Sequence, residues 1–107
     1  MAYVDKREAL RNLSNPNDFN IYKNMFIKMY DKDLIEKIKQ TYQDNQFDEL
    51  YELINNINRI SLNIGSNVLF SETKLLLNEI DNQKVEEKTI LNNLETIDYV
   101  YQELKLL

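Results

Sequence analysis

The residues able to do chemistry in this 107-residue chain are few, and most of them are carboxylates. Histidine and cysteine are both absent, which leaves no imidazole base and no thiolate nucleophile and makes a transition-metal site an unfavoured interpretation. Paired carboxylates can act as general acid and base, but most of those present fall on predicted polar helix faces, where solvation is their ordinary role. The carboxylates from which such a pair could be built include Asp48, Glu49, Glu52, Glu72, Glu79, Asp81, Glu86 and Glu87. We therefore expect a protein that is not an enzyme.

Loops that bind ions or nucleotides are not found either. The sequence has no Asp-x-Asp-x-Asp-Gly loop for calcium and no glycine-rich loop for phosphates. The methionine and aromatic positions occur at helical spacing and are interpreted as core filling; they are Met25, Phe26, Met29 and Phe70. We expect neither a metal nor a cofactor.

The strongest pattern runs from Phe47 to Ile80 and predicts two helices joined at Gly65, the single glycine. Apolar residues recur at spacings of three and four, which places them on one side of each helix. The inward set is Phe47, Leu50, Leu53, Ile54, Ile57, Ile60, Ser61 and Ile64, then Leu69, Thr73, Leu76, Leu77 and Ile80. The opposite face of the first helix carries Asp48, Glu52, Asn55, Asn56 and Arg59. Two amphipathic helices joined by a short turn pack antiparallel, so this hairpin is the spine of a helical bundle.

The chain before the hairpin predicts further helices. One covers residues 4–13, starts at Asp5 or Lys6, and is broken by Pro16 in the SNPND stretch. Its side chains facing the bundle are Val4, Ala9, Leu10 and Leu13. Residues 19–45 hold two apolar stripes of different phase, the first capped by Asn17 or Asp18. The stripes are Phe19, Tyr22, Phe26 and Met29, extended by Ile21 and Met25, and then Leu34, Ile35, Ile38 and Tyr42. One kinked helix and two helices, with a cap at Asp31 or Asp33, both fit this pattern.

Polar stretches at 44–46 and 81–87 separate the hairpin from its neighbours. A last helix is expected from near Glu86, with its apolar face formed by Ile90, Leu94, Ile97, Val100, Tyr101, Leu104 and Leu107. The sequence has no internal repeat, no low-complexity segment and no long linker. We therefore expect a single domain over residues 1–107.

Composition narrows the class of protein. One glycine and one proline leave few turn makers for a sheet of hairpins, and the formal charge of −5 argues against a nucleic-acid surface. No apolar run approaches the roughly 18–20 residues that span a bilayer, and the N-terminus lacks the pattern of a signal peptide. A cytoplasmic location is the expectation. The abundance of Asn, Ile, Lys and Tyr is typical of AT-rich coding DNA, such as that of a low-GC bacterium.

The segment 47–80 resembles the signature region of histidine-containing phosphotransfer (HPt) domains, which relay phosphoryl groups in two-component signalling. That signature has an aromatic residue, leucines, His-x-x-Lys-Gly, and a small polar run ending in an apolar–glycine pair. The residues matching its scaffold are Phe47, Leu50, Leu53, Ile64, Gly65 and Leu69. Counted back from Gly65, the phospho-accepting histidine falls on Asn55, the helper lysine on Asn58 and the small glycine on Arg59. The scaffold is kept and its reactive groups are replaced.

This resemblance implies an all-α fold, an antiparallel four-helix bundle of the HPt type with one or two short additional N-terminal helices. It also implies a protein unable to accept phosphate, because a carboxamide is not nucleophilic near neutral pH. The nearest hydroxyls are those of Tyr51 and Ser61. Tyr51 is either an alternative acceptor or, the interpretation we favour, an amphipathic side chain at the helix edge. Ser61 is expected to point inward and to hydrogen-bond within its helix.

Arg59 leaves several interpretations open. In the family, the small residue at this position lets a receiver domain approach closely, so an arginine crowds that approach or anchors itself in the acidic pocket of the receiver. It is otherwise a solvated residue on an exposed face. The residues expected at the partner-binding face are Tyr51, Glu52, Asn55, Asn58, Arg59 and Ser61.

Two functional hypotheses follow. The first is a regulatory module of a phosphorelay that binds a response-regulator receiver domain or a sensor histidine kinase and cannot itself accept phosphate. The second is a structural helical bundle without a signalling role, self-associating as a homodimer through an apolar strip such as Val68, Leu69, Phe70 or Val100. A weaker third alternative is an unidentified enzyme.

Overall fold

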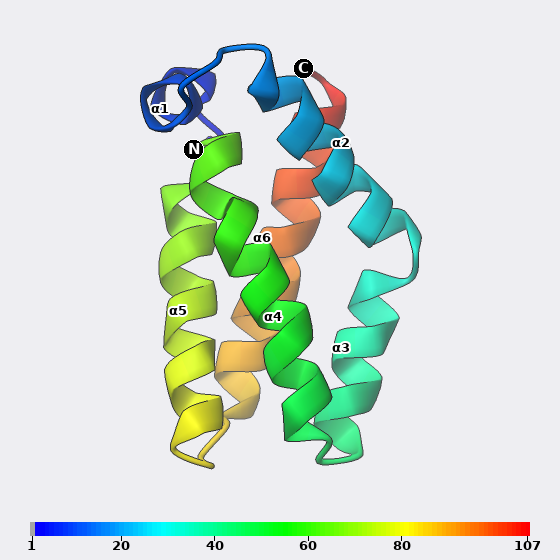
Figure 1. The fold of residues 1–107 in the computed structure, drawn as a ribbon. Helices are drawn as coiled ribbons and strands as arrows, with labels where there is room; N and C mark the ends of the chain where they lie inside the picture. The colour runs from blue at the N-terminus through cyan, green and yellow to red at the C-terminus, as the bar shows by residue number, and fades with distance from the viewer. Residues whose placement is uncertain (1) are drawn as a thin grey trace.

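The computed structural model describes residues 2–107, and within them the protein is all-α, with no strand (Figure 1). The elements are α1 (Lys6–Asn12), α2 (Asp18–Asp31), α3 (Leu34–Gln43), α4 (Phe47–Ser61), the short 3-10 helix η1 (Leu62–Ile64), α5 (Asn67–Asp81) and α6 (Glu87–Lys105). None of these helices combines the length and the apolar character that crossing a bilayer requires.

The hairpin of α4 and α5 is the spine of the fold, as the sequence predicts. Every residue assigned to the inner side of α5 is buried, and on α4 only Phe47 and Leu53 are half-buried. Gly65 makes the turn with φ +79°, a left-handed conformation that glycine adopts without steric cost. Ser66 then caps α5 by accepting a hydrogen bond from the backbone N–H of Leu69.

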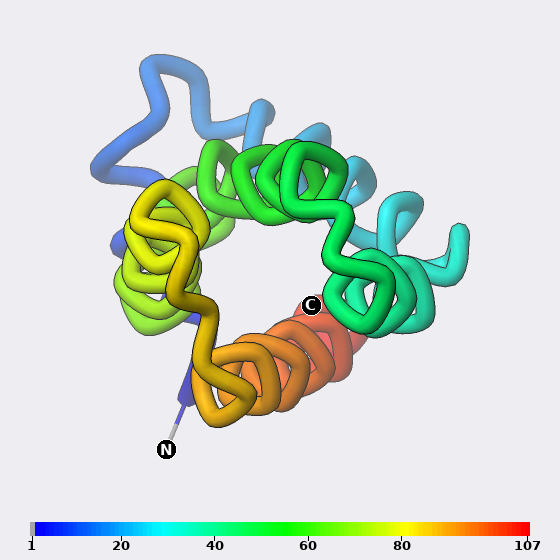
Figure 2. The backbone as a smooth tube through the Cα atoms, turned by 90° about the horizontal axis from the view of Figure 1, so that it is seen from below, coloured from blue at the N-terminus to red at the C-terminus, as the bar shows by residue number. Residues whose placement is uncertain are grey.

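The helices α3 and α6 complete the bundle around the hairpin. Successive helices from α3 to α6 alternate in direction, and in the end-on view they surround a common centre (Figure 2). The helix α4 packs against α3 and α5, and α5 packs against α6. The core therefore lies along the axis of this bundle, filled by the apolar stripes read from the sequence.

Residues 19–45 form two helices rather than one kinked helix. The break is at Asp33, which precedes α3 with φ +62°, a left-handed conformation in which no helix can continue. The helix α2 crosses to α6 in the upper part of Figure 1. The Tyr30 ring of α2 and the Tyr101 ring of α6 stack with centroids 3.7 Å apart. Each tyrosine hydroxyl also donates to a carboxylate of the opposite helix, that of Asp98 and Asp31 respectively. With 14 residues, α2 is not a short accessory helix.

The N-terminal segment closes the upper end of the bundle. The backbone N–H groups of Tyr3 and Val4 donate to the carboxylate of Glu103 on α6, and Asp5 N–H donates to the carbonyl of Gly65 at 2.9 Å. The helix α1 then lies on η1, with Ala9 buried. A Cβ on Gly65 would lie 2.0 Å from the Asp5 carbonyl oxygen, so glycine is required here for packing as well as for its backbone angle.

Three details of the predicted core are wrong. Ile21 and Met25 were assigned to the inner stripe of α2, yet their exposed fractions are 56% and 45%. The stripe consists of the buried Phe19 and Phe26, with Tyr22 and Met29 half-buried against the core. Leu107 is also exposed, because α6 ends at Lys105 before that position can face the core.

The apolar strip proposed for self-association is only partly on the surface. Leu69 and Val100 are fully buried, and Val68 and Phe70 are half-buried. The large apolar side chains that are exposed lie elsewhere; they are Ile21, Met25, Leu75, Leu91, Tyr99, Leu106 and Leu107.

Candidate functional site

Asn55 lies near the middle of α4, on the side away from the bundle centre. It is half-buried, and among the described residues its carboxamide has no hydrogen-bond partner. Its neighbours along the outer face, Glu52, Asn56 and Arg59, are exposed. The position at which the HPt pattern places its reactive histidine is therefore open to solvent here and occupied by an unreactive amide.

Asn58, one turn further along α4, has a different environment. Its amide nitrogen donates to the backbone carbonyl of Phe70 at 3.2 Å and to the hydroxyl of Thr73 at 3.0 Å, both on α5. The Thr73 hydroxyl in turn donates to the Leu69 carbonyl. Asn58 therefore joins the two helices of the hairpin, and its amide nitrogen is engaged within the fold. This role was missed from the sequence, although spacing of four from Ile54 places Asn58 beside the inward stripe.

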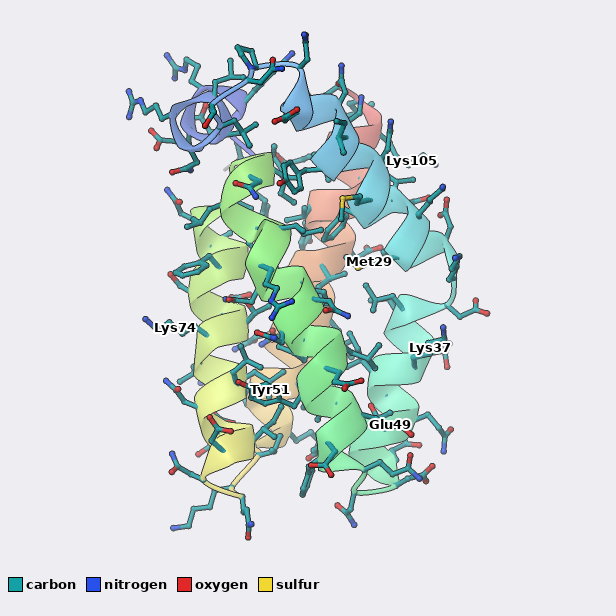
Figure 3. All side chains as sticks on the ribbon, viewed as in Figure 1. Met29, Lys37, Glu49, Tyr51, Lys74 and Lys105 are labelled. Carbon is teal, nitrogen blue, oxygen red and sulfur yellow. The ribbon has the colours of Figure 1, made fainter. Side chains whose placement is uncertain are left out.

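The two hydroxyls near Asn55 are not equivalent. Ser61 is fully buried and donates to the Ile57 carbonyl at 2.7 Å, as predicted, so it cannot belong to a partner-binding surface as well. Its small side chain fills the inner side of α4, and the hydrogen bond satisfies its hydroxyl without any contact outside the helix. Tyr51 is half-buried and lies between α4 and α5 (Figure 3). Its ring packs on the edge of the core, consistent with an amphipathic structural role.

Charge is unevenly distributed along the outer face of α4. The first turn carries Asp48 and Glu49, which suit the positive end of the helix dipole, and Glu52 follows. From Leu53 to Ser71 no residue is acidic, and Arg59 is the single cation in that stretch. Within residues 2–107 the ion pairs are Arg7–Asp5, Arg11–Glu8 and Lys39–Glu36, so the guanidinium of Arg59 has no carboxylate partner.

A shallow groove borders this face between α3 and α4. Its volume is about 520 Å³, and its lining includes Lys37, Asp44, Glu49, Glu52, Leu53 and Asn56. Lys37 of α3 and Glu49 of α4 are labelled in Figure 3. The groove extends the reachable surface from the outer face of α4 toward α3, and its carboxylates make this part of the surface acidic.

The most strongly shifted titratable group lies away from α4. The hydrogen bond from Tyr30 to Asp98 raises the pKa of that phenol to about 12, because an ionised phenolate could not donate it, and burial adds to the shift. This cluster holds α2 against α6. The outer face of α4 remains the best candidate for a functional site.

Searches with this chain against protein-family models, curated proteins and solved structures found no match in any of the three. The geometry of α4 and the sequence pattern on it are therefore the basis for the function proposed below.

Proposed function

We propose that the protein is an HPt-like module of a phosphorelay that binds a receiver domain or a histidine kinase through the outer face of α4 and cannot accept a phosphoryl group. The observation that carries this proposal is the position of Asn55. It stands where the HPt pattern has its acceptor, in the middle of an exposed helix face, with a carboxamide that makes no bond within residues 2–107.

The scaffold around Asn55 supports the same proposal. The hairpin turns at Gly65, and the aromatic and leucine positions of the pattern, Phe47, Leu50 and Leu53, contribute to the core. If Asn55, at the acceptor position, had pointed into the bundle core, an HPt-like site would have been unsupported. The helical bundle of α3, α4, α5 and α6, with two helices before it, is the coarser feature on which the proposal of an HPt-like fold rests.

Loss of phosphoryl transfer follows from chemistry. Transfer needs a nucleophilic nitrogen that can hold a labile phosphoramidate, and the chain contains no histidine. The lysine that would steady phosphoryl oxygens is replaced by Asn58, whose amide is bonded to α5. The module then acts by binding its partner without a chemical step. It either competes with a true relay protein for that partner or serves as an adaptor.

Titration calorimetry against purified receiver domains and kinases encoded in the same genome tests the proposal. We expect at least one receiver to bind, and Arg59→Glu to weaken that binding at least about tenfold, which corresponds to about 1.4 kcal/mol. Lys84→Glu, the same charge change in the loop between α5 and α6, is the matched control and should leave the affinity within about twofold. The proposal would be refuted if none of these receivers and kinases bound the protein, or if Arg59→Glu left the affinity unchanged.

A phosphorylation assay tests the other half of the claim. With a kinase, labelled ATP and a phosphorylated receiver, we expect no label on the protein. Sedimentation of the free protein addresses the structural alternative, because a tight homodimer that buries Asn55 leaves no room for a receiver on this face.

A further inference from the structure

The outer face of α4 has two unused hydrogen-bond donors on adjacent turns. Asn55 and Arg59 are four residues apart and therefore lie one above the other on the same side of the helix. The carboxamide of Asn55 makes no hydrogen bond among the described residues, and the guanidinium of Arg59 is exposed and forms no ion pair there. Together they present amide and guanidinium N–H groups to solvent.

The surroundings of these two donors favour an anion. No carboxylate occurs from Leu53 to Ser71, although the chain carries a formal charge of −5. Glu72, the next acid, does not compete for Arg59, because it lies on the α6 side of α5, where Asn93 of α6 bonds its backbone carbonyl and one of its carboxylate oxygens is buried. Glu52, one turn before Asn55, is the acidic boundary of the patch. A negatively charged group bound at Asn55 and Arg59 would contact hydrogen-bond donors, and the nearest carboxylate, that of Glu52, would lie at the edge of the patch.

A phosphoryl group fits these donors better than a carboxylate alone. Its three oxygens accept several hydrogen bonds at once, and arginine binds such oxygens through two parallel N–H groups in charge-assisted bonds about twice as strong as neutral ones. Asn55 can donate from its amide nitrogen without attacking phosphorus. We infer, on the basis of the proposed function, that this patch binds the phosphorylated form of a receiver domain more tightly than its unphosphorylated form, with Asn55 and Arg59 contacting the phosphoryl oxygens.

The phosphoryl group stays on the receiver in this complex. Ser61 is buried and its hydroxyl is bonded to Ile57, and the Tyr51 ring lies in the seam between α4 and α5 (Figure 3). Ser61 is therefore out of reach of a bound phosphoryl group, and Tyr51, one turn before Asn55, has its ring against the edge of the core on the α5 side. The module would hold the activated receiver and keep it from a competing relay histidine, without changing any covalent bond.

The test compares one receiver in two forms. Calorimetry is performed with the unmodified receiver and with the same receiver loaded with Mg²⁺ and beryllofluoride, a stable mimic of the aspartyl phosphate. We expect the loaded form to bind at least about tenfold more tightly. Arg59→Gln should remove most of this preference, and Glu52→Gln, which removes the nearest negative charge, should increase it. Arg59 and Glu52 are exposed, so circular dichroism should show an unchanged fold for both variants.

Lys74→Gln is the matched control, because it makes the same charge change on the neighbouring helix. Lys74 extends from α5 away from α4 (Figure 3), with its Nζ 5.9 Å from the centroid of the Phe70 ring, so its loss should leave the preference intact. Equal loss of preference in Lys74→Gln and Arg59→Gln would overturn the assignment to Arg59. Equal affinity for the two receiver forms overturns this inference and leaves the proposed function standing. If no receiver in either form and no kinase binds the protein, both are overturned.

Discussion

Two asparagines one turn apart on α4 have opposite roles. Asn58 bonds the carbonyl of Phe70 and the hydroxyl of Thr73 and so fixes α4 against α5, whereas the carboxamide of Asn55 faces outward with no partner in the described part of the chain. The inner side of the hairpin has satisfied polar groups, as a buried interface must. The outer side has polar groups without a hydrogen-bond partner within residues 2–107. Their free-energy cost is small only because water or a binding partner can reach them. The comparison separates what holds the fold from what is available for binding.

The largest effect on the inner side is expected from Gly65→Ala. We predict a loss of about 3 kcal/mol or more in the free energy of unfolding, of which roughly 1–2 kcal/mol is the cost of a left-handed backbone. The rest arises from a clash, because the Asp5 carbonyl oxygen lies 2.0 Å from the ideal position of the new Cβ. The Cβ must therefore displace this carbonyl and the N-terminal segment that carries it. Urea denaturation measures the loss.

Gly65→Asn separates the two causes, since asparagine tolerates left-handed angles but brings the same Cβ. It should remain clearly destabilised. A loss below about 0.5 kcal/mol in either variant, the range of an ordinary surface substitution, would contradict the role given to this turn.

The comparison of the two asparagines is tested by the same substitution at each. Asn58→Ala should lower the free energy of unfolding by about 1–2 kcal/mol through loss of its two hydrogen bonds. Asn55→Ala should leave stability within about 0.5 kcal/mol of wild type. Because both changes place alanine in the interior of one helix, the gain in helix propensity cancels in their difference. Equal effects at the two positions would remove the distinction between them.

Much of this architecture could be predicted from the sequence. The helical spacing of Leu50, Ile54 and Ile57 and the single glycine were enough to place the hairpin, because burial of an apolar stripe dominates helix packing. The burial of Ser61 and its bond within the helix also followed from spacing. The HPt type of the bundle and the binding partners of the protein stay predictions.

Other features could not be predicted because they depend on contacts between distant segments. The sequence offered a break capped at Asp31 or Asp33 but could not decide it against a kink, because the left-handed conformation of Asp33 does not follow from helical spacing. The role of Asn58 depends on Thr73 facing it, and the stack of Tyr30 on Tyr101 depends on where α2 crosses α6. Ile21 and Met25 were misplaced for a related reason, since periodicity alone does not say how wide a buried stripe is.

A pH titration sharpens the distinction between structural and available polar groups. The pKa of Tyr30 is raised to about 12 by its hydrogen bond to Asp98, so the folded protein holds this proton more tightly than the unfolded chain, where the pKa is near 10. The stabilisation is fully present below pH 10 and is lost as the pH rises toward 12. The difference in melting temperature between wild type and Tyr30→Phe should therefore shrink over that interval. A constant difference would show that the phenol proton is not involved.

The smallest effect is expected in the loop between α5 and α6. Gln83 has φ +56°, and Gln83→Gly should raise the free energy of unfolding by roughly 0.5–1 kcal/mol, because relief of left-handed strain exceeds the added entropy of the unfolded chain. Asn78→Gly, in the exposed part of α5, is the control and should be destabilising. Loss of stability in Gln83→Gly would mean that the loop does not bear the strain assigned to it.

The central claim, that the outer face of α4 is a partner surface and its inner side is not, is tested most directly by NMR of the side-chain N–H groups. With a receiver domain that binds, we predict that the amide signals of Asn55 and the Nε–H signal of Arg59 shift, while the amide signals of Asn58 do not. Binding that shifts α6 signals and leaves Asn55 and Arg59 unchanged would contradict the account.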